Sequence, residues 1–219
     1  MSHTAVVTGA SRGIGAACAA ALAGAGFHVV SVARSEGEYR CNLTDPVAWE
    51  ATAKRILAER GVPEVVVNNA GGYFVKPLAE TTVAEFQQLM ALNLTAAFAV
   101  ARTFLPAMLA AGRGTFISIG SVADHNGFAE NAAYAASKYG LRGLHETLCD
   151  EYRGSGVKLT LVSPGPVDTT LWDPIDPDNR EGFTPRAEML KPADVAEAVL
   201  FAATRPPHVH VDWLRLGPV

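Results

Sequence analysis

Residues 8–15 read Thr8-Gly9-Ala10-Ser11-Arg12-Gly13-Ile14-Gly15, and this stretch decides the fold. The apolar residues before it predict a short strand, and the Ala-rich stretch that follows, up to residue 25, predicts a helix. Gly9 permits a tight turn, whereas Gly13 and Gly15 leave room for backbone N–H groups to approach a pyrophosphate at the helix N-terminus. Because the glycine-rich loop joins a strand to a helix, it is predicted to bind a dinucleotide.

Strand and helix patterns alternate along the rest of the chain. Runs such as Val65–Val67 and Leu159–Val162 are apolar without polar alternation, as is typical of strands buried on both faces. This order predicts an α/β fold, a single doubly wound Rossmann-like parallel sheet with helices on both faces. We expect strands near residues 4–8, 28–33, 38–41, 64–68, 114–120, 157–163 and 208–216. Helices are expected near residues 13–25, 46–60, 82–111 (divided in two near Asn93), 132–154 and 193–204.

One connection is unusually short. Only six residues separate Arg34 from Cys41, whereas a parallel crossover normally needs a dozen or more residues and a helix. The fold is therefore expected to be shortened between its second and third strands. The third strand is predicted to be either very short or joined by a bare loop.

The composition excludes several classes of function. The 219 residues are 49% apolar and contain no linker or internal repeat, so residues 1–219 are expected to form one domain. A net charge of −4 without a basic patch argues against nucleic acid. No apolar run approaches the ~20 residues of a membrane span. The scattered Cys18, Cys41 and Cys149 show no metal-binding spacing and predict free thiols in a reducing cytoplasm.

Tyr134 and Lys138 lie four residues apart in Tyr134-Ala135-Ala136-Ser137-Lys138. On a helix their side chains share one face. A free phenol has a pKa near ~10, and a neighbouring cation is expected to lower the pKa of Tyr134 so that it can exchange a proton with a substrate oxygen. Ser121, at the end of a predicted strand, can hydrogen-bond the same oxygen. By itself this spacing is common on exposed helices, so its weight depends on the glycine-rich loop upstream.

Together these motifs resemble those of the short-chain dehydrogenase/reductase family. They occur in the family's order and near its spacings over roughly residues 4–170. The matching pieces are Thr8-Gly9-x-x-x-Gly13-x-Gly15, Asn68-Asn69-Ala70-Gly71, Asn93, Ser121, Tyr134-x-x-x-Lys138 and Ser163-Pro164-Gly165-Pro166-Val167-Asp168-Thr169.

The resemblance implies a role for each motif. Tyr134 would be the general acid/base, Ser121 would hold and polarise the substrate oxygen, and Lys138 would also hold the nicotinamide ribose. Asn93 would lie in a kinked helix and complete a water-linked proton path; a solvated helix asparagine is the alternative. The expected cofactor-binding residues are Gly9, Ser11, Arg12, Gly13, Ile14, Gly15, Arg34, Asn42, Leu43, Asn69, Ala70, Gly71, Tyr134, Lys138, Pro164, Gly165, Val167 and Thr169.

The end of the second predicted strand bears on the choice of cofactor. NAD-preferring enzymes of this type place an acidic residue there, but this chain has Ala33 followed by Arg34. A guanidinium suits a 2′-phosphate, and Arg12 could add a second positive charge. NADP(H) is therefore predicted over NAD(H), although Arg34 could instead point to water. Asn42 stands where the family often has an acidic residue, and its amide oxygen could accept from the adenine amino group.

The substrate is less defined by the sequence. Candidate contacts are Tyr73, His125, Phe128 and Trp172, and the Pro-, Asp- and Gly-rich stretch 171–190 is predicted to act as a lid. His125 is equally compatible with a surface or loop histidine. A small carbonyl compound or alcohol is the expected substrate class.

The sequence leaves more than one oligomeric state and more than one activity possible. The helices near 82–111 and 132–154 form the usual dimer face in the family, so a homodimer or homotetramer is expected. A non-catalytic NADP-binding sensor or scaffold, or an epimerase working through a transient ketone, could use the same fold. A β-ketoacyl thioester reductase is a narrower option, but it would call for a basic patch that the sequence does not clearly show.

Overall fold

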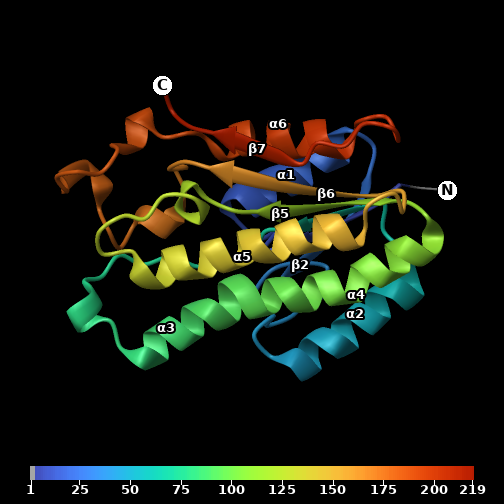
Figure 1. The fold of residues 1–219 in the computed structure, drawn as a ribbon, viewed down its shortest axis with the longest axis horizontal. Coiled ribbons are helices and arrows are strands. Elements are labelled where there is room, and N and C mark those ends of the chain that lie inside the picture. The colour runs from blue at the N-terminus through green and yellow to red at the C-terminus, as the bar shows by residue number, and fades with distance from the viewer. Residues whose placement is uncertain (1–2) are drawn as a thin grey trace.

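The computed structural model describes residues 3–219 as a seven-stranded parallel sheet between two layers of helices (Figure 1). The strand order is β3-β2-β1-β4-β5-β6-β7. Strands β1 to β3 are added toward one edge of the sheet and β4 to β7 toward the other, so the strand order reverses between β1 and β4. This confirms the predicted doubly wound α/β fold. The strands are β1 (Thr4–Thr8), β2 (His28–Ala33), β3 (Tyr39–Arg40), β4 (Val65–Asn68), β5 (Gly114–Ile119), β6 (Val157–Pro164) and β7 (Trp213–Leu216).

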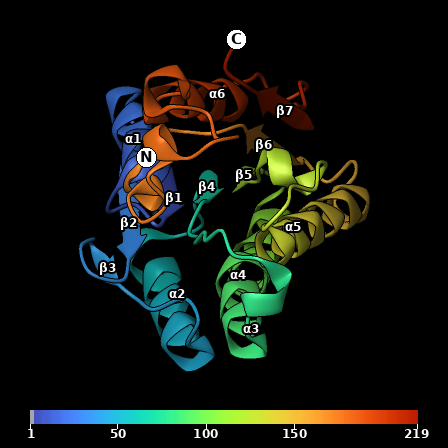
Figure 2. The same cartoon turned by 90° about the vertical axis from the view of Figure 1, so that its left-hand side faces the viewer.

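Helices cover both faces of the sheet (Figure 2). The α-helices are α1 (Gly13–Gly24), α2 (Pro46–Arg60), α3 (Val83–Met90), α4 (Ala96–Ala111), α5 (Ala132–Glu151) and α6 (Pro192–Ala203). Alternate residues of β1 contribute to two hydrophobic cores, because side chains in a strand point to opposite faces. Val6 packs in the core under α2 and α4 with Trp49 and Phe104, whereas Val7 packs with Leu22 under α1 and α6.

The shortened connection after β2 is confirmed. Residues 34–38 form no helix or strand, and β3 pairs through two residues only, Val32 with Tyr39 and Ala33 with Arg40. Contacts with α2 hold this edge in place of a crossover helix. The Tyr39 side chain is buried in the same core as Trp49, and its hydroxyl donates to Glu59 of α2 at 2.5 Å.

Residues 83–111 form one continuous helical path rather than two separated helices. A π-helical turn, Ala91–Thr95, joins α3 to α4 around Asn93. The expected break is therefore a change of helical pitch. By length and mean hydropathy (1.6 over 18 residues) this path could cross a membrane, unlike the sequence expectation. Phe104 and Met108 on it are fully buried against the sheet, and a core helix meets the same criteria.

The last strand is shorter than expected. Pairing with β6 begins at Trp213 rather than near residue 208. Residues just before it touch β6 through single hydrogen bonds, in which Thr160 Oγ1 donates to the Val211 carbonyl at 2.6 Å and Leu161 N donates to that of Asp212 at 2.9 Å. The segment 208–212 therefore follows the sheet edge without forming a full ladder.

Replacing Gly15 by alanine is expected to destabilise the β1–α1 turn by about 1–3 kcal/mol, the usual cost of overpacking, and to weaken dinucleotide binding. A Cβ at Gly15 would lie 2.2 Å from the Gly9 carbonyl oxygen. Urea unfolding and cofactor titration would measure both effects. Gly24→Ala, in the same helix with nothing near its Cβ, is the control. Equal stability of Gly15→Ala and wild type would contradict this account.

Candidate active site

A cleft of about 1240 Å³ opens at the carboxyl ends of the parallel strands, where a doubly wound sheet places its ligands. Every predicted cofactor-binding residue lines it. So do Ser121, Tyr134 and Lys138, together with Tyr73, Phe128 and Trp172 from the predicted substrate set. Asn93 and His125 are not among the lining residues. Sequence positions 9–184 thus converge on one cleft large enough for both a dinucleotide and a small substrate.

The glycine-rich turn is braced from β4. Thr8 Oγ1 accepts hydrogen bonds from the backbone N–H groups of Asn69 (3.0 Å) and Ala70 (3.1 Å). Asn69 Nδ2 donates to the Thr8 carbonyl at 2.9 Å. A Cβ at Gly9 would lie 2.8 Å from Asn69 Nδ2, and Gly9 has a positive φ of 67°. The packing therefore requires glycine here, and this cradle before α1 fits the pyrophosphate of a dinucleotide.

Helix α5 carries Tyr134 and Lys138 one turn apart, with both side chains facing the cleft. Lys138 is buried, and its Nζ donates to the Ile119 carbonyl at the end of β5 at 2.9 Å. The same Nζ lies 5.7 Å from the centroid of the Tyr134 ring. The strand end thus fixes the ammonium beside the phenol, as the four-residue spacing predicts.

The ionisation of this pair differs from the sequence expectation. Burial disfavours the phenolate and raises the pKa of Tyr134 to about 12, against a smaller lowering by the Ser121 hydroxyl. Burial also disfavours the ammonium and lowers the pKa of Lys138 to about 8, opposed by the charge of Asp124. The pKa of Tyr134 is therefore raised rather than lowered in this state of the protein, because desolvation is the largest effect on it.

Asp124, which the sequence analysis did not single out, holds the backbone at Ser121 in place through hydrogen bonds. It is fully buried, and its Oδ2 accepts from Ser121 N at 3.1 Å and from Ser163 Oγ at 2.5 Å. Its Oδ1 lies 2.6 Å from His125 Nδ1. Ser121 Oγ in turn accepts from Ala123 N at 3.1 Å. The signal was present as Ser121-x-x-Asp124, the spacing of a capping box.

His125 does not line the cleft. Its ring packs edge-on against Trp213, with centroids 5.5 Å apart, and its Nδ1 is hydrogen-bonded to Asp124. Its position therefore favours the alternative of a loop histidine, and the predicted substrate contact gains no support from it.

Asn93 is buried in the π-turn and makes three hydrogen bonds. Its Nδ2 donates to the Gly72 carbonyl and to Ser137 Oγ, both at 3.0 Å, and its Oδ1 accepts from Gly72 N at 2.8 Å. The alternative of a solvated helix asparagine is thus excluded. The amide ties the segment after β4 to the α5 turn that carries Lys138, and the predicted water-linked role stays a prediction.

Aromatic rings gather at the substrate end of the cleft. The Tyr73 ring lies 4.7 Å from that of Tyr134 and 5.1 Å from that of Trp172. Asn131, absent from the sequence-predicted set, also lines this end. Its Oδ1 is the buried side-chain polar atom without a hydrogen-bond partner among residues 3–219. An unpaired buried acceptor is costly, and the Nδ2 of the same side chain donates to the Tyr73 hydroxyl at 3.4 Å.

The adenine end carries the features that bear on cofactor choice. Ala33 and Arg34 both line the cleft, and the Arg34 residue is exposed. Asn42 lines it too, but its Oδ1 already accepts from Thr44 Oγ1 at 2.9 Å. The expected use of that oxygen for an adenine amino group would therefore compete with Thr44.

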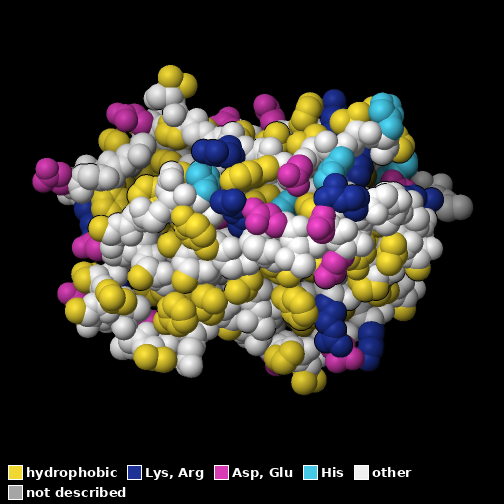
Figure 3. Space-filling view, in the orientation of Figure 1, with side chains coloured by type: hydrophobic (Ala, Val, Ile, Leu, Met, Phe, Trp, Pro, Cys, Tyr) yellow, Lys and Arg dark blue, Asp and Glu magenta, His cyan; other side chains and the backbone are white. Residues whose placement is uncertain are grey.

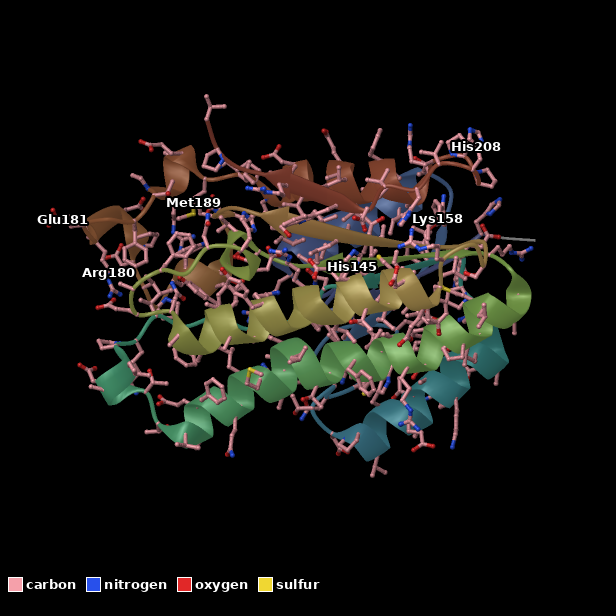
Figure 4. The ribbon with its side chains drawn as sticks, in the orientation of Figure 1. His145, Lys158, Arg180, Glu181, Met189 and His208 are labelled. Atoms are coloured by element: carbon pink, nitrogen blue, oxygen red, sulfur yellow. The ribbon has the colours of Figure 1, made fainter. Side chains whose placement is uncertain are left out.

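The predicted lid, residues 171–190, consists of short 3-10 turns held by ion pairs. Arg186 Nη1 donates to Asp168 at 2.9 Å and its Nη2 donates to Asp173 at 2.5 Å. Arg180 pairs with Glu130 at the mouth of the cleft, and Figure 4 shows it at the end of the molecule formed by this segment. The predicted lid is thus linked to the segment after β6 through Asp168, and to the loop before α5 through Glu130.

Comparison with known proteins agrees with this architecture. Residues 3–180 match the family model described as short chain dehydrogenase. The chain belongs to the short-chain dehydrogenase/reductase family. It is an NAD(P)-dependent oxidoreductase that acts on CH–OH groups of small molecules.

Three relatives illustrate the range of similarity. The chain is 33% identical to the 3-oxoacyl-(acyl-carrier-protein) reductase FabG of Escherichia coli K12, with 91% of this chain and 89% of that protein covered. It is 30% identical to D-threitol dehydrogenase of Mycolicibacterium smegmatis, covering 91% and 85%. A metagenomic short-chain oxidoreductase solved with NADP is 36% identical with a TM-score of 0.82, covering 99% and 97%.

The buried ammonium of Lys138 predicts a pH-dependent stability. Its pKa of about 8 in the fold lies below the unfolded value near 10.5, so the unfolded state binds more protons between these pH values and stability rises with pH there. Relative to Lys138→Met, the cofactor-free wild type should gain about 3 kcal/mol from pH 7 to pH 10.5. Urea unfolding of both proteins across this range measures the difference. A difference that stays constant with pH would mean that Lys138 is not desolvated.

Proposed function

We propose that this protein is an NADP-dependent carbonyl reductase or alcohol dehydrogenase that uses Tyr134 as general acid/base. The observation that carries the proposal is the convergence of Tyr134, Ser121 and Lys138 on one wall of a cleft whose floor is the glycine-rich cradle. Bound NADPH would supply the hydride for the carbonyl carbon. The protein's own groups would position the substrate and move the proton.

The proton step follows from the ionisation of the site. The raised pKa of Tyr134 keeps its hydroxyl protonated at neutral pH, which suits a donor of a proton to a carbonyl oxygen. Ser121, held from behind by Asp124, would hydrogen-bond the same oxygen and stabilise the charge that develops on it. Lys138 would stabilise the phenolate left on Tyr134, and Asn93 would link Lys138 to solvent through water.

The preference for NADP rests on Ala33 and Arg34. Ala33 offers no carboxylate to the ribose hydroxyls, whereas the exposed Arg34 lines the cleft where a 2′-phosphate would lie. Similar solved proteins were bound to NADP or to 5-hydroxy-NADP. Arg12, also exposed at the cleft, would add a second charge.

The substrate is proposed to be a small carbonyl compound or alcohol that lies beside the Tyr73 and Trp172 rings at this end of the cleft. A second candidate is a 3-oxoacyl thioester, which the similarity to FabG favours. An epimerase that works through a transient ketone is an alternative use of the same site. Product analysis with a single enantiomer of an alcohol substrate would separate epimerisation from oxidation.

A cytoplasmic homodimer or homotetramer is the proposed state of the protein. The support for an oligomer is the exposure of large apolar side chains on α4 and α5, which include Phe98 (50% exposed), Leu109 (49%) and Tyr139 (46%). Figure 3 shows hydrophobic side chains on the face where these helices lie. Exposed apolar patches of this kind commonly mark interfaces.

Replacing Tyr134 by phenylalanine should lower kcat/KM by at least ~10²-fold, the usual contribution of a general acid, because the ring is kept and only the proton donor is lost. The loss is measured by NADPH oxidation with a panel of substrates. The panel contains pairs of carbonyl compounds that differ by one hydroxyl group, and 3-oxoacyl thioesters. NADPH binding, followed by calorimetry, should be nearly unchanged. Turnover that survives the substitution would exclude Tyr134 as the donor.

Calorimetric titration should show tighter binding of NADPH than of NADH. Ala33→Asp should lower this preference by about 10–100-fold, because charged hydrogen bonds contribute ~1.5–3 kcal/mol and the carboxylate would favour ribose hydroxyls over phosphate. Arg34→Ala should weaken NADPH binding and spare NADH. Tighter NADH binding by the wild type, or an unchanged ratio in both variants, would contradict the assignment.

A further inference from the structure

A cluster of three potential ligands lies outside the cleft, between the second half of α5 and the segment that enters β7. His145 and Cys149 are four residues apart on α5, and Asp212 immediately precedes β7. His145 is buried, Cys149 is half-buried and Asp212 is exposed. Figure 4 shows His145 between α5 and the sheet. None of the three has a part in the proposed reaction.

The three ligand atoms form a nearly equilateral triangle. His145 Nε2 lies 3.4 Å from Cys149 Sγ, Cys149 Sγ lies 3.4 Å from Asp212 Oδ1, and His145 Nε2 lies 3.4 Å from the same Oδ1. Zinc bonds of about 2.0–2.3 Å in a tetrahedral arrangement separate neighbouring ligand atoms by roughly 3.3–3.7 Å. The triangle therefore matches one face of such a coordination tetrahedron.

We propose that His145, Cys149 and Asp212 bind a divalent transition-metal ion of the zinc type. Imidazole, thiolate and carboxylate together suit Zn²⁺, and a mixed set with sulfur disfavours Mg²⁺ and Ca²⁺, which prefer oxygen ligands. Binding forms a metal–Sγ bond and breaks the Sγ–H bond, with the proton released to solvent. Water would complete the tetrahedron on the side where Asp212 is exposed.

The backbone already holds the three donors in position. His145 and Cys149 share one face of α5 because they are four residues apart. The Asp212 carbonyl accepts from Leu161 N of β6 at 2.9 Å, which fixes this residue at the sheet edge. Cys149 Sγ also approaches the Leu159 carbonyl of β6 at 4.0 Å. A metal would thus link α5 to the start of β7 without rearrangement of either element.

Without a metal, the same atoms form a hydrogen-bonded cluster, and this is the competing account. Burial and the neighbouring Asp212 carboxylate raise the pKa of the Cys149 thiol to about 12, so Sγ–H can donate to Asp212. A metal site and a hydrogen-bonded cluster can be told apart by metal binding. Only the metal site would bind one ion per protein molecule with the Cys149 sulfur as a ligand.

Cobalt(II) is the probe for the test, because a thiolate ligand gives it a sulfur-to-metal charge-transfer band and tetrahedral coordination gives strong visible bands. The chelator-treated full-length protein should bind one Co²⁺ with both features, and Zn²⁺ should displace it. Cys149→Ser should abolish the charge-transfer band. Cys18→Ala, which removes a buried thiol of α1, should keep it.

A second pair of variants avoids any loss of folding. The Asp212 side chain is 70% exposed, so Asp212→Asn should fold normally and bind Zn²⁺ at least ~10-fold more weakly, in competition with a chromophoric chelator. Asp150→Asn, which removes an exposed carboxylate next to Cys149, should bind as tightly as the wild type. The proposal is overturned by the absence of one-to-one Co²⁺ uptake, by a charge-transfer band that survives Cys149→Ser, or by equal affinities of the two asparagine variants.

Discussion

The buried carboxylate of Asp124 is the interaction on which the catalytic wall depends. A charge removed from water must be compensated by hydrogen bonds or partners, and Asp124 takes them from Ser121 N, Ser163 Oγ and His125. These groups belong to the loop after β5 and to the end of β6, and Trp213 of β7 donates to Ser163 Oγ at 2.8 Å. The loop after β5, the end of β6 and the first residue of β7 are thereby joined beside Ser121, which lines the cleft.

The charge of Asp124 also acts on the reacting pair. It favours the ammonium of Lys138 and disfavours the phenolate of Tyr134. Both effects keep protons on the two groups, which is the direction that the proposed reduction of a carbonyl would require. The same carboxylate thus holds Ser121 in place and biases the charge state of the residues opposite it.

The features that were predictable from the sequence are those set by local spacing. The glycine-rich turn, Tyr134 with Lys138, and the bare connection after β2 each depend on a few adjacent residues, and each lies where it was predicted. The features that were missed depend on distant partners. His125 lies outside the cleft lining, hydrogen-bonded to Asp124 and packed against Trp213. Likewise, the pKa of Tyr134 is set by burial that no spacing reveals, and His145 and Cys149 meet Asp212 only because β7 lies beside β6. The sequence expectation of no metal site rested on spacing within one segment, which cannot detect such a cluster.

The two-residue strand β3 has a consequence for the behaviour of the protein in concentrated solution. The edge of a sheet exposes unpaired backbone N–H and C=O groups to which another chain can add a strand. Here β3 is only Tyr39–Arg40 long, with the tyrosine buried against α2 and the arginine exposed. A strand added at β3 would find too few backbone groups for a stable ladder and would meet a positive charge. Because β3 pairs only with Val32 and Ala33, residues 28–31 of β2 have no strand partner on that side in the part of the chain that the structure describes, so the short connection leaves this part of the sheet margin open to strand addition.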